Sequence, residues 1–174
     1  MSRENKIIIV FSVVCVFLQL ILAPNIAIGS AQPNFILVAL LVSSIYRSQL
    51  FCVSYGFGMG LLCDLVGNSP VGSMSFILAA AGFILVYLRK FISSDVSSTV
   101  ILVLTIAAFL CELTAGIFLI LLGQGINFGE TFLYDIIPST IYNALAITLA
   151  YFAMRRAING KQHKQLTKGR LRFR

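Results

Sequence analysis

Long apolar runs separated by short polar breaks form the dominant pattern along this chain. Charged side chains rarely interrupt the runs, which is typical of membrane-spanning helices that need about 20 mostly apolar residues each. The pattern therefore predicts an all-α integral membrane protein with about six transmembrane helices. The six candidate spans are 7–23, 33–46, 50–66, 71–88, 99–122 and 132–154.

The second and third candidate spans are the least regular. Span 33–46 has 14 residues, which at a rise of about 1.5 Å per residue is shorter than a hydrocarbon core of about 30 Å. Pro33 opens this span, where a missing backbone N–H does no harm. The third span is rich in glycine and ends at Asn68-Ser69-Pro70, a sequence typical of a turn. We expect both spans to be short and irregular, and the other four to be conventional.

The basic residues predict the orientation of the chain. With six spans, all 13 Lys and Arg residues lie on one side of the membrane, and the loops 24–32, 67–70 and 123–131 contain none. The positive-inside rule assigns the basic side, and hence both termini, to the cytoplasm. Arg3 and Lys6 before an apolar run also resemble a signal peptide. That run is about 17 residues long, against 7–15 for a signal peptide, so we favour a retained first helix.

The composition leaves little room for a soluble domain. Hydrophobic residues make up 59% of the chain and charged residues 11%, and the mean hydropathy is +0.96. A soluble domain would contain about a quarter charged residues. We therefore predict one transmembrane domain, residues 1–154, followed by a basic cytoplasmic tail, residues 155–174.

The tail holds eight Lys and Arg residues and no acidic residue. We expect it to adhere to anionic lipid, with docking of a cytoplasmic partner as the second option. Nucleic-acid binding ranks a distant third, because the basic run has a single aromatic residue, Phe173, and no fold to present it. The tail positions that we single out are Arg155, Arg156, Lys161, Lys164, Lys168 and Arg170.

Residue patterns that would support catalysis, or binding of a metal or cofactor, are not recognisable. The four cysteines are dispersed without a Cys-x-x-Cys pair, and the single His163 lies in the basic tail. No phosphate-binding loop or nucleophile–base pair occurs. We therefore predict a protein that is not an enzyme and that uses no cofactor or metal.

Glu112 lies midway along the fifth span, where no basic residue is expected at the same depth. It could be structural, hydrogen-bonded at a helix–helix contact to Thr105, Thr114 or Asn143. It could instead couple protons or substrate, as intramembrane carboxylates do in transporters. With one acid and no partner charge, we favour the structural role, with Glu112 and Asn143 as candidate buried polar residues.

The most informative segment is 56–72. Gly56 and Gly60 form a small-xxx-small face on which another helix can approach closely. Asp64, near the end of the same span, should face protein or a water-filled pocket, because a charge is costly in lipid. Pro70 and Gly72 belong to the turn that follows. We expect these five residues to pack helices or to contact a partner.

This segment, with Pro33-Asn34-Phe35 and Tyr46, resembles the signature of the rod shape-determining protein MreD family. The signature has a proline that opens the second span, a Gly-Phe-x-x-Gly-Leu-x-x-Asp-Leu core and a Pro-x-Gly turn. The resemblance implies a multi-pass protein of the bacterial inner membrane that acts as a non-catalytic scaffold in cell-wall elongation. The partners it implies are MreC, the actin-like MreB, and RodA with its class B penicillin-binding transpeptidase.

The alternative is the substrate-binding membrane component of a vitamin- or metal-type importer, which has a similar length and number of spans. Two observations argue against it. The first span lacks the Ala-x-x-x-Ala face that such subunits use to grip their coupling subunit. A substrate pocket also needs several convergent polar groups, and the outer loops offer few besides Asn25, Gln32, Asn34, Gln124 and Asn127.

Overall fold

A computed structural model describes residues 3–27, 31–66, 71–89, 97–122 and 128–159. These residues form six helical rods, as the all-α prediction requires. Pro70 and the tail positions Lys161, Lys164, Lys168 and Arg170 lie outside the described residues. The elements are α1 (Arg3–Phe17), η1 (Leu18–Leu22), α2 (Ala23–Asn25), α3 (Phe35–Ser44), α4 (Gln49–Val66), α5 (Ser73–Leu88), α6 (Ser97–Leu121), α7 (Phe128–Thr131), η3 (Phe132–Ile136) and α8 (Ile137–Asn159).

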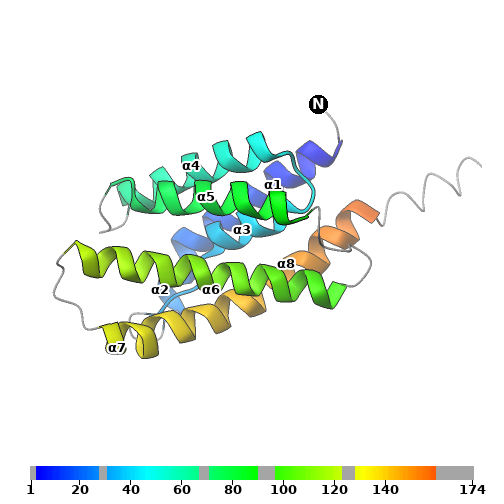
Figure 1. The fold of residues 1–174 in the computed structure, drawn as a ribbon. Coiled ribbons are helices and arrows are strands. Elements are labelled where there is room, and N and C mark those ends of the chain that lie inside the picture. The colour runs from blue at the N-terminus through cyan, green and yellow to red at the C-terminus, as the bar shows by residue number, and fades with distance from the viewer. Residues whose placement is uncertain (1–2, 28–30, 67–70, 90–96, 123–127, 160–174) are drawn as a thin grey trace, which may run out of the picture.

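Successive rods alternate in direction along the bundle (Figure 1). The beginning of α1 and the end of α8 therefore lie at the same end of the molecule, which we call the basic end (Figure 1). The basic residues of the described chain map to the helix ends and the connection found there: Arg3, Lys6, Arg47, Arg89, Arg155 and Arg156. Three rods are long and apolar enough to cross a membrane: Lys6–Asn25, Ser97–Leu121 and Phe128–Ile158.

Helix α3 lies at the centre of the bundle. It contacts α1, α4, α5, α6 and α8, and all of its residues from Ile36 to Ser44 are buried. Its ten residues span about 15 Å, which is half the thickness of a hydrocarbon core. The helix is shorter than the predicted span 33–46, because Asn34 already caps its first turn through a hydrogen bond from the Leu37 amide.

The irregular turns lie in the first and last rods, not in the third span. Helix α4 is an uninterrupted α-helix despite its three glycines. In contrast, the first and last rods each contain a five-residue π-helical segment, η1 and η3. Pro24 follows η1 and Pro138 follows η3, each two residues after the last π-helical position. Because proline has no N–H to donate to the carbonyl four residues earlier, it favours a local change of helical pitch. The predictions that the third span is irregular and that the first and sixth spans are conventional were therefore wrong.

Candidate functional site

Helices α4 and α5 are in direct backbone contact. A Cβ atom added at Gly56 would lie 2.5 Å from the Leu78 carbonyl oxygen, and one at Gly60 would lie 2.5 Å from the Ser75 Cα. The contact is reciprocal, because a Cβ at Gly82 of α5 would lie 2.7 Å from the Cys52 carbonyl oxygen. Such distances leave no room for a side chain at these positions. The helix that fills the Gly56 and Gly60 face is therefore the chain's own α5.

Asp64 caps the first turn of α5 from the end of α4. Its carboxylate is 2% exposed and accepts five hydrogen bonds from the neighbouring helix. The donors are the amides of Gly72 (2.9 Å), Met74 (3.0 Å) and Ser75 (3.1 Å) and the hydroxyls of Ser73 (3.2 Å) and Ser75 (2.9 Å). A carboxylate at a helix N-terminus satisfies the free amides there and interacts favourably with the helix dipole.

Gly72 gives the backbone the conformation that this cap requires. It has φ +100°, and it is the only described residue with a positive φ. Glycine adopts this left-handed conformation without a steric penalty, and the turn directs the Gly72 amide at the Asp64 carboxylate. Gly60, Asp64 and Gly72 thus join α4 and α5 into one closely packed helical hairpin.

At the basic end, Arg89, which follows α5, caps the C-terminus of α3. Its Nη1 donates hydrogen bonds to the carbonyl oxygens of Ser44 (3.0 Å), Ile45 (2.7 Å) and Arg47 (3.1 Å). A positive charge at a helix C-terminus satisfies free carbonyls and complements the helix dipole. Arg155 of α8 donates a hydrogen bond to the Ser97 hydroxyl at the start of α6. The sequence marked these arginines only as indicators of topology and lipid contact.

The N-terminus of α3 is held by side chains from two other rods. The Asn34 amide donates to Oδ1 of Asn143 in α8 (2.8 Å), and the Phe35 amide donates to Oε1 of Gln19 in η1 (2.7 Å). Asn143 is fully buried, and its Nδ2 donates to Oε1 of Glu112 (3.0 Å). Asn143 is one of the three partners that the sequence suggests for Glu112. This chain of contacts places the beginning of α3 level with Glu112 of α6 and Asn143 of α8, inside the bundle and not at its end.

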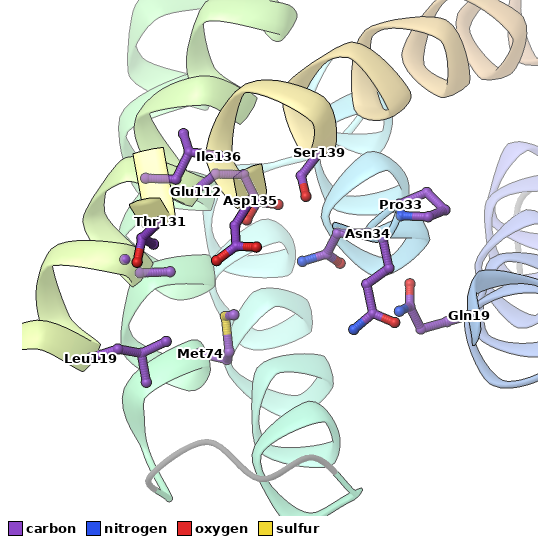
Figure 2. Close-up of a pocket in the computed structure, with 13 residues that line it drawn as sticks. Gln19, Pro33, Asn34, Met74, Glu112, Leu119, Thr131, Asp135, Ile136 and Ser139 are labelled. Carbon is purple, nitrogen blue, oxygen red and sulfur yellow. The ribbon is translucent and has the colours of Figure 1, made fainter. Parts of the chain in front are cut away.

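A cavity of about 240 Å³ lies beside this network (Figure 2). Glu112 and Asp135 lie on one side of it, and Asn34, Pro33 and Gln19 lie opposite (Figure 2). Asp135 comes from η3 in the last rod and Glu112 from α6, and no local sequence pattern indicates that they share a cavity. The lining residues are Gln19, Gln32, Pro33, Asn34, Met74, Glu112, Ala115, Gly116, Leu119, Thr131, Asp135, Ile136 and Ser139.

Comparison with known proteins decides the family. The family model for the rod shape-determining protein MreD matches residues 3–159. The chain belongs to the MreD family. The resemblance predicted from the signature around residues 33–73 is thus confirmed, and the match extends over nearly the whole chain. No curated protein and no solved structure matches the chain significantly.

The MreD signature residues serve the fold in two places. Gly56, Gly60, Asp64 and Gly72 join α4 to α5, and Pro33-Asn34 begins the central helix α3. Phe57, the aromatic residue of the signature, is different, because its side chain is 54% exposed on the outer face of α4. Family membership makes the chain a rod-shape-determining membrane protein. Three candidate spans agree with that location.

Proposed function

We propose that this MreD-family protein is a non-catalytic scaffold of the bacterial cell-wall elongation machinery. It would bind MreC and the RodA synthase with its class B penicillin-binding transpeptidase, with MreB as a further member of the assembly. The family match over residues 3–159 carries this proposal. In the proposed orientation the chain passes through the inner membrane six times, and α3 covers about the cytoplasmic half of its pass. The basic end faces the cytoplasm, where the tail adheres to anionic lipid.

Partner binding is proposed to occur through the outer faces of the helices. Little of the described chain lies outside the rods, so partners have few loops to contact. The Gly56 and Gly60 face cannot serve this purpose, since α5 fills it. Phe57 contributes to the family signature but not to the buried core, because more than half of its side chain is exposed. We therefore expect the outer face of α4 around Phe57 to contact a partner.

The test is affinity purification of the tagged full chain from gently solubilised native membranes. Recovery of MreC with the RodA synthase is the expected result. Phe57→Ala should reduce that recovery several-fold while leaving the yield of folded chain unchanged. Phe152→Ala is the matched control, because Phe152 is 51% exposed on α8, outside the signature. Equal loss with both variants would contradict a specific α4 contact.

The importer subunit is the second candidate function, and the polar cavity is the observation that favours it. Its volume of about 240 Å³ is somewhat below the range of roughly 300–1,000 Å³ that is usual for small-molecule sites. In the same purification, recovery of an ATPase pair with a coupling membrane subunit would overturn the scaffold proposal and establish this alternative.

A further inference from the structure

We propose that the cavity at the N-terminus of α3 binds a cationic hydrogen-bond donor, either an ammonium or a guanidinium group. The inference concerns the cavity alone and does not depend on the scaffold proposal. Four observations support it: two carboxyl groups in the lining, a buried hydroxyl without a partner, the positions of the two π-helical segments, and the capped state of the helix N-terminus.

The cavity is lined by two carboxyl groups and by no basic side chain. Glu112 and Asp135 both line the cavity, and none of the lining residues is Lys, Arg or His. The N-terminus of α3 offsets only about half an elementary charge through its dipole. An intramembrane carboxylate usually faces a partner or a pathway, so a cationic group is the complementary occupant.

Thr131 supplies a polar group that the fold itself does not use. Its side chain is 6% exposed and lines the cavity, and its Oγ1 has no hydrogen-bond partner among the described residues. The threonines of α8, farther along the same rod, behave differently. Thr140 Oγ1, for example, donates to the Ile136 carbonyl oxygen of its own helix (2.7 Å). A buried hydroxyl without a partner costs free energy, and a ligand in the cavity would remove that cost.

Both π-helical segments contribute residues to the same cavity. Gln19 comes from η1, and Asp135 and Ile136 come from η3. Single π-helical turns occur frequently at functional sites because they redirect side chains at the expense of regular hydrogen bonding. The two prolines that accompany these segments therefore shape one cavity, although Pro24 and Pro138 lie in the first and last rods.

The helix N-terminus does not make the cavity an anion site. The Asn34 and Phe35 amides already donate to Asn143 and Gln19, and the Leu37 amide donates to the Asn34 side chain. Oε1 of Glu112 accepts one hydrogen bond, from Asn143, and the second oxygen of this carboxyl group can accept another from a donor in the cavity. A volume of about 240 Å³ would hold roughly eight water molecules at about 30 Å³ each, enough for the end of a basic side chain or a small amine.

The first test measures the thermal stability of the purified full chain in detergent with increasing n-butylamine. n-Butanol and n-butyrate serve as neutral and anionic ligands of similar size. We expect stabilisation by the amine alone, since a ligand that binds the folded state raises its stability. Glu112→Gln and Asp135→Asn should each weaken the apparent affinity roughly 10-fold or more, the usual effect of losing a charged hydrogen-bond partner. Stabilisation by butylamine no greater than that by butanol would overturn the proposal.

Thr131→Val provides a second readout that does not depend on charge. If the hydroxyl serves a ligand, the variant should bind butylamine several-fold more weakly while the chain without ligand becomes more thermostable. Thr140→Val is the matched control and should leave amine binding unchanged. If Thr131→Val binds butylamine as tightly as the wild-type chain, the Thr131 hydroxyl is not part of the site. If Glu112→Gln also binds butylamine with full affinity, the proposal that the cavity binds a cationic group is wrong.

The source of the cationic group is resolved by zero-length carbodiimide cross-linking in native membranes. A lysine side chain of a partner protein in the cavity would form an amide with Glu112 or Asp135, which mass spectrometry of the peptides identifies. A small amine from solution would instead give a low-mass adduct on the same residues. Either product supports the proposed site. If the wild-type chain gives neither product and the purified chain also fails to bind butylamine, the proposal is wrong.

Discussion

Glycines on two faces of α4 have different roles at the residue scale. A Cβ at Gly60 would lie 2.5 Å from the Ser75 Cα and 2.6 Å from the Met74 carbonyl oxygen, both of which belong to backbone. A Cβ at Gly58 would meet nothing within 4 Å. The same amino acid thus permits a backbone contact at one position and leaves an open surface two residues away.

Gly60→Ala should therefore destabilise the protein, whereas Gly58→Ala should not. Overpacking of this kind costs about 1–3 kcal/mol. Replacing a helical glycine at an open position instead stabilises a helix by up to about 1 kcal/mol. The measurement is the midpoint of thermal unfolding of each purified variant in the same detergent. Equal midpoints for the two variants would contradict the close packing of α4 on α5.

Asp64 is the other residue on which the helical hairpin depends. Asp64→Ala would leave three amides and two hydroxyls at the N-terminus of α5 without their acceptor. Each unsatisfied buried group costs about 1–3 kcal/mol, so we expect a loss of several kcal/mol and a low yield of folded protein. Ser75→Ala removes a single hydroxyl donor and should cost much less. Wild-type stability and cell shape with Asp64→Ala would show that the cap is dispensable.

At the scale of elements, a short buried helix organises the bundle. Helix α3 depends on side chains from other rods at both ends: Asn143 and Gln19 at its N-terminus and Arg89 at its C-terminus. A ten-residue helix is only marginally stable by itself, because nucleation is costly and isolated helices need about 12–15 residues. Tertiary contacts therefore determine that α3 forms and at what depth it ends.

Arg89→Gln should weaken the end of α3 at the basic end. The substitution removes the charge and most of the donors that reach the three carbonyl oxygens, for an expected loss of about 1–3 kcal/mol. Arg156→Gln is the matched control, because Arg156 is exposed in the last turns of α8. Hydrogen exchange of the α3 amides should rise in Arg89→Gln only. Equal exchange in both variants would contradict a capping role.

At the scale of the whole molecule, charge asymmetry and rod direction agree. The sequence predicts that the basic residues gather at one end of the bundle. All Lys and Arg residues of the described chain map to the helix ends and the connection at the basic end. The opposite end contains the cavity and the acidic residues Glu130 and Asp135. This division is the basis for proposing a cytoplasmic basic end.

Cysteine labelling in intact cells tests the proposed orientation. Gln124→Cys should react with a membrane-impermeant maleimide added from the periplasmic side, whereas Lys90→Cys should react only after the inner membrane is permeabilised. Both variants are compared with the parent chain, whose four cysteines lie in the helices. The reverse pattern would invert the topology, and labelling of both residues from one side would contradict the six-span count.

The sequence by itself determined the class of the protein, the order of its helices, its charge asymmetry and its family. These properties depend on local composition and on short motifs, such as the segment from Gly56 to Gly72 and Pro33-Asn34. They can be predicted because the length of each apolar segment and the charges that flank it determine the insertion and orientation of that helix almost independently of the other helices.

Only the tertiary structure decided which groups meet. The sequence indicated that Gly56 and Gly60 admit a close helix, but not that α5 is that helix, nor that Gly82 completes the contact. Equally, the shared cavity of Glu112 and Asp135 depends on the rotation and depth of α6 and α8, and on the π-helical turn beside Pro138. Rotation and depth result from packing between residues far apart in the chain, which no local pattern encodes.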